Sequence, residues 1–510
     1  MEQLCYPEMP MFSLFGYGRK TSQYNSNFTH HWLRLNRART NWKAILRPCK
    51  DQQSWVTVRQ GWTNDKRSSA SESFISHMDI QRSGHFSRIF IQSQTAKGKP
   101  KTFGGDSWRV YITGPANIAA HVFDHENGTY EAIALIMEAG KYTVHAYLDY
   151  SLCDGLRDPP KNWFNLGNFH GRNQPEGSIG FLDHFLYEKM KPSKFHTFEV
   201  RPARKRLQGR AGEDLSTSIA PIKCEHSCRC LASGLGRWLS NEWVPFVQGC
   251  CDREQDMKRK SLILKFDREV KSRKMNFNTQ SSSSEVTKGS LWIYGDSLAV
   301  RFYNSVATTT LCQTLFRSCG YSYNWVYPIP NENEAVAKKL NDDFDFRPEL
   351  VLESIRNVLR RDDMKTDESI LILNFVLHYT MSLNFTTYQR LVDDVIVMLR
   401  NRWRDLGSNA RIIWKTSTAI KKENEPIPRN LTFKRFFTDP RVRLFDTYAM
   451  SAMCKAGFEV LDVFKLTDSY LPGPTDVVHY HPFVFKTVQK ELEIYAQTRK
   501  RYQPTEICVQ

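Results

Sequence analysis

From residue 290 onward, short apolar runs alternate with amphipathic stretches, and this rhythm limits the possible folds more than any other feature of the sequence. Residues 369–375 form a continuous apolar run, as a strand that is covered on both faces requires. Residues 388–403 carry apolar side chains at helical spacing, and Gly407 follows as a stop signal. The alternation predicts a parallel sheet with helices on both faces, a doubly wound α/β domain.

The other elements of this domain follow from the same patterns. Further strands are expected at residues 290–294, 410–416 and 458–464, and further helices at 299–306, 348–359, 440–455 and 483–495. In such a sheet the reactive groups lie beyond the carboxyl ends of the strands. Side chains that directly follow a predicted strand are therefore the first candidates for chemistry.

Gly295-Asp296-Ser297-Leu298 follows the strand predicted at 290–294 and precedes the helix predicted at 299–306. Ser297 is thus expected in a strand-to-helix turn, with its hydroxyl open to a substrate and its peptide N–H near the positive end of the helix. The same four residues are also ordinary turn formers. A catalytic serine needs support from a second feature.

That second feature is Asp476-Val477-Val478-His479, between a Pro- and Gly-containing loop and the helix predicted at 483–495. An Asp three residues before a His can orient the imidazole while the imidazole accepts a serine proton. An early Ser and a late Asp-x-x-His resemble the order in SGNH/GDSL hydrolases. We predict a triad of Ser297, His479 and Asp476.

Stabilisation of an oxyanion has three candidates besides the triad chemistry itself. The peptide N–H of Ser297 is one, the side-chain amide of Asn374 is a second, and a backbone donor at Gly320 is a third. Asn374 equally fits a buried polar residue with satisfied hydrogen bonds. His378 and His481 are rival imidazoles, but neither has an Asp at a one-turn offset, so they are expected to line the pocket or contact substrate.

The N-terminal half contains four short strand-like segments between residues 107 and 148. Asn127-Gly128 supplies the positive φ angles that a tight hairpin requires. Short strands at this spacing predict an antiparallel β-sandwich of immunoglobulin-like character. Its histidines, His121, His125 and His145, occur singly and are expected to be structural.

We therefore predict four regions along the chain. Residues 1–104 are unassigned, 105–222 form the sandwich, 223–289 form a Cys- and Trp-rich connector with a serine-rich linker, and 290–510 form the α/β domain.

Of the 12 cysteines, five cluster at Cys224, Cys228, Cys230, Cys250 and Cys251. Disulfides in an oxidising compartment explain such a cluster, with reduced thiols or a zinc site as alternatives. The spacing Cys-x3-Cys-x-Cys lacks the paired Cys-x2-Cys rhythm of common zinc modules, so disulfides are favoured and no metal site is predicted. Cys312 and Cys319 are close enough in sequence to bridge, while the connectivity of the cluster stays open.

Four sequons, at Asn27, Asn127, Asn384 and Asn430, fit a glycoprotein, although a chain of this length contains about as many by chance. Residues 1–20 have no continuous apolar core, and no apolar run is long enough to span a membrane. The protein is then either intracellular or lacks its targeting segment in this chain. The cysteine cluster favours the second, and with it a secreted or Golgi/ER-lumenal protein.

The net charge is +17, with basic clusters near residues 201–210 and 258–274. Solvated linkers are the plainest explanation, and anionic glycans would be attracted by the same field. No zinc-finger, helix-turn-helix or RNA-binding aromatic signature accompanies the charge, so nucleic acid is not expected as a partner.

Four blocks in a fixed order resemble the neurexophilin and PC-esterase domain (NXPE) family over residues 105–510: the stretch 114–130, the Trp- and Cys-rich connector, Gly295-Asp296-Ser297 and Asp476-Val477-Val478-His479. The resemblance implies a neurexophilin-like sandwich followed by an SGNH-type PC-esterase domain in a secreted or Golgi-lumenal glycoprotein. It also implies transfer or removal of acyl groups, chiefly acetyl, on glycan hydroxyls. One departure is that the Gly-x-Asn of the third SGNH block reads Ile372-Leu373-Asn374 here.

The expected mechanism uses no cofactor beyond an acyl donor, such as acetyl-CoA if the protein is a transferase. His479 removes the proton of Ser297, which attacks an acyl carbonyl, and the acyl group then passes to water or to a sugar hydroxyl. The alternative is a catalytically inactive secreted ligand of a cell-surface receptor. Ser, Asp and His in the expected order favour the enzyme, because a scaffold has no need of that combination.

Overall fold

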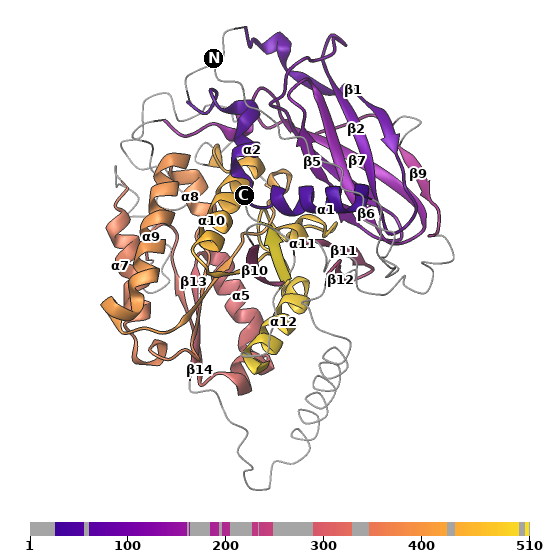
Figure 1. Cartoon of the computed structure of the whole chain (residues 1–510). Helices are drawn as coiled ribbons and strands as arrows, with labels where there is room; N and C mark the ends of the chain where they lie inside the picture. Colours follow the sequence, from indigo (N-terminus) through magenta and orange to yellow (C-terminus); the bar gives the residue numbers. More distant parts are fainter. Residues whose placement is uncertain are drawn as a thin grey trace, which may run out of the picture.

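The computed structural model describes residues 26–55, 61–160, 163, 184–192, 196–203, 227–232, 234–247, 289–328, 346–425, 434–498 and 505–508. These residues form an antiparallel β part and an α/β part that lie side by side (Figure 1). As predicted, the antiparallel sheets belong to the N-terminal half and the parallel sheet to the C-terminal half.

Two antiparallel sheets form the sandwich. One has the order β1 (Ser68–Asp79), β2 (His85–Thr95), β6 (Thr129–Ile136) and β5 (His121–Asp124). The other has the order β4 (Ile118–Ala119), β3 (Ser107–Thr113), β7 (Gly140–Tyr150) and β8 (Glu188–Lys189), and β9 (Thr197–Val200) also pairs with β7. Alternate apolar side chains of both sheets share one core, such as Ile89 and Ile91 of β2 with Val110 and Ile112 of β3.

The predicted hairpin at Asn127-Gly128 joins β5 to β6. Gly128 has a φ of +86°, and a Cβ there would lie 2.0 Å from the Lys101 carbonyl oxygen, so no other residue fits this turn. The boundary predicted at residue 105 is wrong, because β1 and β2 precede it. Small buried residues such as Ala70 and Ser73 make the hydrophobic alternation weak in β1, whereas β2 shows it at Ile89 and Ile91 and loses it at Ser93.

The α/β part has a seven-stranded sheet in the order β14 (Ser318–Tyr323), β13 (Ser290–Gly295), β15 (Ile370–Leu373), β16 (Arg411–Lys415), β17 (Glu459–Leu461), β10 (Ser227–Ala232) and β18 (Thr505–Cys508). All neighbouring strands are parallel except β18, which is antiparallel to β10. Because β13 lies between β14 and β15, the winding direction changes at its carboxyl end. That end is where a doubly wound sheet places its site.

Strand β10 comes from the region predicted as a connector, which is a second correction to the domain boundaries. Cys228 and Cys230 are 2% and 0% exposed and act as the small apolar side chains of a sheet strand. A sequence pattern of cysteines and one arginine suggests a stapled loop rather than a strand. The strand expected at residues 262–266 and the serine-rich linker lie outside the described residues.

Helices cover both faces of this sheet. Helices α7 (Pro348–Leu359), α8 (Leu377–Ser382), α9 (Phe385–Leu406) and α10 (Asp439–Lys455) contribute to the core on one face. Helices α5 (Ser297–Ala307), α11 (Phe464–Asp468) and α12 (Lys486–Thr498) contribute to the core on the other. Gly407, with a φ of +64°, ends α9 as predicted.

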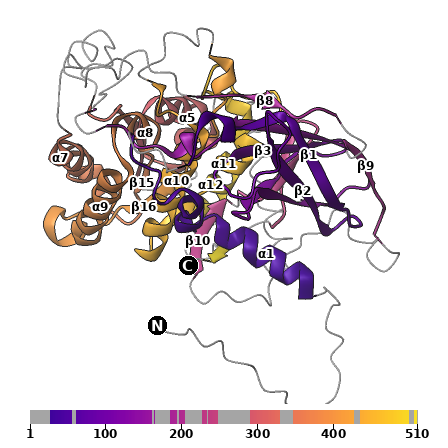
Figure 2. The ribbon, with the colours of Figure 1, turned by 90° about the horizontal axis from the view of Figure 1, so that it is seen from above.

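Helix α1 (Ser26–Ala38) contacts β2 of the sandwich and β18 of the α/β part, and in Figure 2 it lies close to β2 and β10. Helix α2 (Trp42–Leu46) contacts α10. Phe28 and Trp32 of α1 pack on the sandwich residue Phe86 and its neighbours. Trp42 of α2 packs against Phe385 and Tyr448 of the α/β part. The N-terminal helices therefore join the two parts.

Three disulfides connect described residues: Cys49–Cys153, Cys228–Cys454 and Cys312–Cys319. The prediction for Cys312 and Cys319 is confirmed, and Cys228 is confirmed with an unexpected partner. Cys230 is a correction, because it is a buried thiol 2.8 Å from the Ala232 carbonyl oxygen. Cys224, Cys250 and Cys251 lie outside the described residues.

Peptide mapping without reduction is expected to recover these three linked peptides. Alkylation before denaturation should leave Cys230 unmodified, since the thiol is 0% exposed, and alkylation after denaturation should modify it. A peptide that links Cys228 to a cysteine other than Cys454 would contradict the arrangement of β10 in the sheet.

Candidate active site

Ser297 is the first residue of α5 and follows the carboxyl end of β13. Asp296 caps the helix, because its carboxylate accepts a hydrogen bond from the Leu298 N–H at 2.9 Å. A Cβ at Gly295 would lie 2.3 Å from the Asn374 carbonyl oxygen, so glycine is required where β13 and β15 end together. Gly295 thus allows the close approach of the two strand ends, Asp296 caps α5, and Ser297 follows directly after the end of β13.

The structure brings Ser297, His479 and Asp476 together in one hydrogen-bonded chain. His479 Nδ1 lies 2.6 Å from Asp476 Oδ2, and His479 Nε2 lies 2.8 Å from Ser297 Oγ. With Nδ1 donating to the carboxylate, Nε2 accepts from the serine hydroxyl. This geometry permits transfer of the serine proton to the imidazole.

The loop that carries Asp476 and His479 fixes its own side chains. Asp476 Oδ1 accepts hydrogen bonds from the backbone N–H groups of Val478 (2.8 Å) and His479 (2.9 Å). Partial burial opposes the charged form, but these bonds and the one from the His479 ring hold the pKa of Asp476 well below its usual range. Asp476 therefore stays ionised next to the imidazole.

The segment 418–424, which follows β16, holds this loop in place. The Lys421 N–H donates to the Val477 carbonyl oxygen at 2.8 Å, and Asn424 Nδ2 donates to the Asp476 carbonyl oxygen at 3.0 Å. The Tyr480 hydroxyl donates back to the Ala419 carbonyl oxygen at 2.9 Å. The position of His479 thus depends on residues that sequence reasoning did not select.

The sandwich in turn holds this segment. Arg109 of β3 binds both carboxylate oxygens of Glu423, at 3.0 and 3.1 Å, and also Asp149 of β7, at 2.8 Å. The Lys421 ammonium contacts the hydroxyl of Tyr111, which shares with Arg109 the face of β3 that points away from the sandwich core. A chain of contacts therefore runs from the antiparallel sheet to the Asp476 loop.

Two buried charged groups lie behind Ser297. Burial raises the pKa of Asp296 to about 6, against the opposing effects of the Leu298 N–H, His479 and Lys415. Burial likewise lowers the pKa of Lys415 to about 8, although Asp296 and Asp446 act against it. The sequence holds a signal for Lys415, because this lysine directly follows the apolar run Ile412-Ile413-Trp414 of β16.

A small cavity of about 10 Å³ is lined by residues that include Leu298, Phe302, Lys415, Tyr480 and Phe485, but by none of the three triad residues. A volume of this size admits about one water-sized group.

Asn374 lies at the end of β15 and is 1% exposed. Its side-chain nitrogen donates to the Lys415 carbonyl oxygen at 2.8 Å, and its side-chain oxygen is buried with no hydrogen-bond partner among the described residues. Asn324, which we did not predict, follows β14 and donates its N–H to the Gly295 carbonyl oxygen at 2.7 Å. Its side-chain nitrogen is buried and has no hydrogen-bond acceptor among the described residues.

The other predicted residues do not take part in the hydrogen-bonded chain of the triad. Gly320 is within β14, where it pairs with Trp292, three positions before the pair that includes Gly295, so its backbone is part of the sheet rather than of the turn. His378 is 8% exposed and stacks on Trp325. His481 is exposed and stacks on Phe483.

Three of the sequon asparagines, Asn27, Asn127 and Asn384, are exposed, and Asn430 lies outside the described residues. Across the described ranges, no three His, Cys, Asp or Glu side chains gather as a metal ion would require. Over the same ranges, every helix is too short or too polar to cross a membrane.

Comparison with protein-family models and with curated proteins finds no match. Among solved structures, the filamin domain of Lin-41 is similar over 16% of this chain and 80% of its own, at 19% identity and a TM-score of 0.14. A second solved structure is similar over 42% of this chain and 97% of its own, at 12% identity and a TM-score of 0.28. Likenesses this distant carry no functional argument, so a function has to be inferred from the geometry of the Ser297 site itself.

Proposed function

We propose that this protein is a serine esterase or O-acyltransferase that acts on small acyl groups, chiefly acetyl, at glycan hydroxyls. The hydrogen-bonded chain from Asp476 through His479 to Ser297 supports the proposal most directly. The resemblance to the NXPE family supplies the substrate class, the immunoglobulin-like and SGNH-like assignments of the two parts, and the secreted or lumenal setting.

In the proposed reaction, His479 accepts the Ser297 proton while the serine oxygen attacks the acyl carbonyl. The Ser297 N–H, at the start of α5, and the second amide hydrogen of Asn374 stabilise the oxyanion. The Asp476 carboxylate and the buried Asp296 both stabilise the imidazolium that forms. The imidazolium then donates its proton to the departing alcohol or thiol of the acyl donor, which leaves the acyl group as an ester on Ser297. In the second half-reaction His479 accepts a proton from water or from a sugar hydroxyl, whose oxygen takes the acyl group, and the proton returns to Ser297.

A fluorophosphonate probe tests the first step. The wild-type protein is expected to be labelled covalently, because such probes react with a serine whose proton is removed by a neighbouring base. Ser297→Ala should abolish labelling, whereas Ser305→Ala, which changes another serine of α5, should leave it intact. Equal labelling of wild type and Ser297→Ala would refute the assignment of the nucleophile.

A further inference from the structure

A second cavity, of about 370 Å³, lies between α1, α2, strand β5 and the start of α10. Its volume is in the range of small-molecule sites, roughly 300–1,000 Å³. Trp108 and Phe123 of the sandwich and Pro440 of α10 contribute to its wall. The Cys49–Cys153 disulfide, also in the wall, ties the N-terminal helices to the sandwich, so the cavity is covalently braced.

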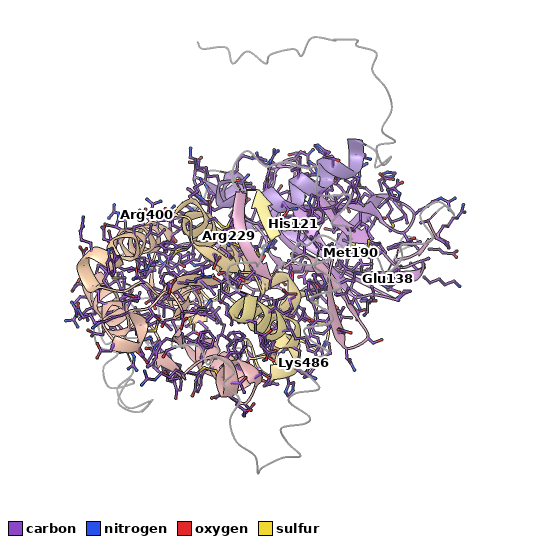
Figure 3. The ribbon with its side chains drawn as sticks, turned by 60° about the horizontal axis from the view of Figure 1, so that its bottom comes forward. His121, Glu138, Met190, Arg229, Arg400 and Lys486 are labelled. Carbon is purple, nitrogen blue, oxygen red and sulfur yellow. A yellow bond between two sulfur atoms is a disulfide. The ribbon has the colours of Figure 1, made fainter. Side chains whose placement is uncertain are left out.

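Basic side chains reach this cavity from two sides. His30, Arg34 and Arg37 lie three or four positions apart on α1, so they share one helix face. Arg443 reaches the cavity from α10, and His121 from β5. Figure 3 labels His121 in the middle of the molecule, between the sandwich and the α/β part.

The acidic residues around the cavity offset this charge only in part. Arg34 pairs with Glu131 at 2.7 Å, whereas Arg443 approaches Asp439 only to 3.9 Å. Within the described part of the chain, Arg37 makes no ion pair. At least two guanidinium groups therefore keep donors for a ligand.

The two carboxylates in the wall are engaged within the protein. Asp106 accepts a hydrogen bond from Lys101 Nζ at 2.8 Å, and Asp124 accepts one from the Gly105 N–H at 2.7 Å. Lys101 therefore neutralises Asp106, whereas the bond from Gly105 leaves the charge of Asp124 in place on one side of the wall.

The cations around the cavity affect the pKa of His121, which also lies in the wall. Burial lowers the pKa of His121 well below its ordinary value, and Arg443, Lys465 and Arg34 lower it further. His121 is therefore a neutral ring with one N–H donor among several cations. Like charges around a half-enclosed cavity repel one another, and an anion placed between them relieves that repulsion.

We propose that this cavity binds a small molecule that carries an oxyanion, either a carboxylate or a phosphate group. The anion lies between Arg37 and Arg443, the neutral His121 ring donates a hydrogen bond, and the aromatic wall packs against the rest of the molecule. Guanidinium groups bind both kinds of oxyanion through paired N–H donors. None of the residues that line the cavity belongs to the Ser297 triad, so this site does not depend on the proposed catalysis.

Calorimetric titration of the full chain with glucuronate, glucose 6-phosphate and glucose tests the proposal, because these probes differ only at one carbon. Saturable binding of either anion at low salt, with none of glucose, is the expected result, and the tighter of the two identifies the oxyanion. Raising the salt concentration should weaken that binding.

The double variant Arg37→Gln/Arg443→Gln is expected to lower the affinity at least tenfold. Arg400→Gln/Arg404→Gln removes the same charge from α9, away from His121 (Figure 3), and should bind as wild type does. The exposed single variant Arg37→Gln gives the same test if the double variant fails to fold. Absence of saturable binding, equal binding of glucose, or an equal loss in both double variants would each overturn the proposal.

Discussion

Replacing His479 by glutamine is expected to lower the turnover of an acetyl ester by about 10⁴-fold, since comparable triads lose about this much without their base. Glutamine still reaches Ser297 but cannot accept its proton at neutral pH. Turnover of 4-nitrophenyl acetate at saturating concentration measures the loss. KM should change far less than kcat, because the imidazole acts on the transition state rather than on substrate binding.

Asp476→Asn is expected to cost roughly 10³- to 10⁴-fold, because the amide no longer fixes the imidazole tautomer. His77→Gln serves as the control, since His77 is an exposed histidine of β1 in the sandwich. The low pKa of Asp476 keeps it charged at ordinary assay pH, so any loss of activity on mild acidification must come from another group. Variants of His479 and Asp476 that retain full activity would exclude the triad mechanism.

The second large effect is expected at Arg109, which is 6% exposed and pairs with Asp149 and Glu423. Arg109→Met leaves two carboxylates without their cation, and loss of one partner of a buried ion pair typically costs about 3–5 kcal/mol. Activity should also fall, on the order of 10- to 100-fold, because the segment that holds the Asp476 loop loses its anchor. Thermal denaturation and ester turnover at a temperature where the variant is folded measure the two effects.

The stability loss at Arg109 should depend on pH in a defined direction. In the wild-type protein, burial raises the pKa of Asp149 to about 6 even though Arg109 opposes the shift. Without Arg109 this pKa rises further above its unfolded value of about 3.9, so the contribution of Asp149 to stability is lost as the pH rises through the folded pKa. The deficit of Arg109→Met should therefore shrink when the pH is lowered from about 8 to about 5.

Arg441→Met is the matched control for Arg109→Met. Arg441 is also buried, and it pairs with Asp158 and donates to the Thr380 and Leu383 carbonyl oxygens. These partners lie outside the segment 418–424, so this variant should lose stability but keep turnover while it is folded. Full activity in Arg109→Met would show that the sandwich does not position the Asp476 loop.

Helix-start and helix-stop residues and the spacing of apolar side chains predict much of this fold from the sequence. A proline at Pro348 and an apolar stripe gave the bounds of α7, and Gly407 gave the end of α9. Strands β1, β2 and β10 were missed for a physical reason, because their buried positions include serine, alanine and cysteine. Hydrophobic periodicity cannot distinguish small buried side chains from loop residues.

The residues of the candidate site also fall into those that a local sequence pattern indicates and those that only the structure reveals. Ser297 follows a strand, and Asp476 and His479 share one turn, so each half of the triad has a local pattern. Arg109 and Glu423 are 314 residues apart, and no local pattern connects them. Lys415 had a local signal, but its meaning depended on the burial of Asp296, which only the structure reveals.

The position of β10 has a consequence for the biosynthesis of the protein. This strand leaves the ribosome before β13 but pairs with β17, and Cys228 is 226 residues before its partner Cys454. Strand β17 has not been translated when β10 leaves the ribosome. Strand β10 therefore stays unpaired while most of the α/β part is translated. The Cys228–Cys454 bond can form only after residue 454 is made, which is still before β17 (Glu459–Leu461) and β18 (Thr505–Cys508). Chains released before β17 should therefore expose β10 to chaperones.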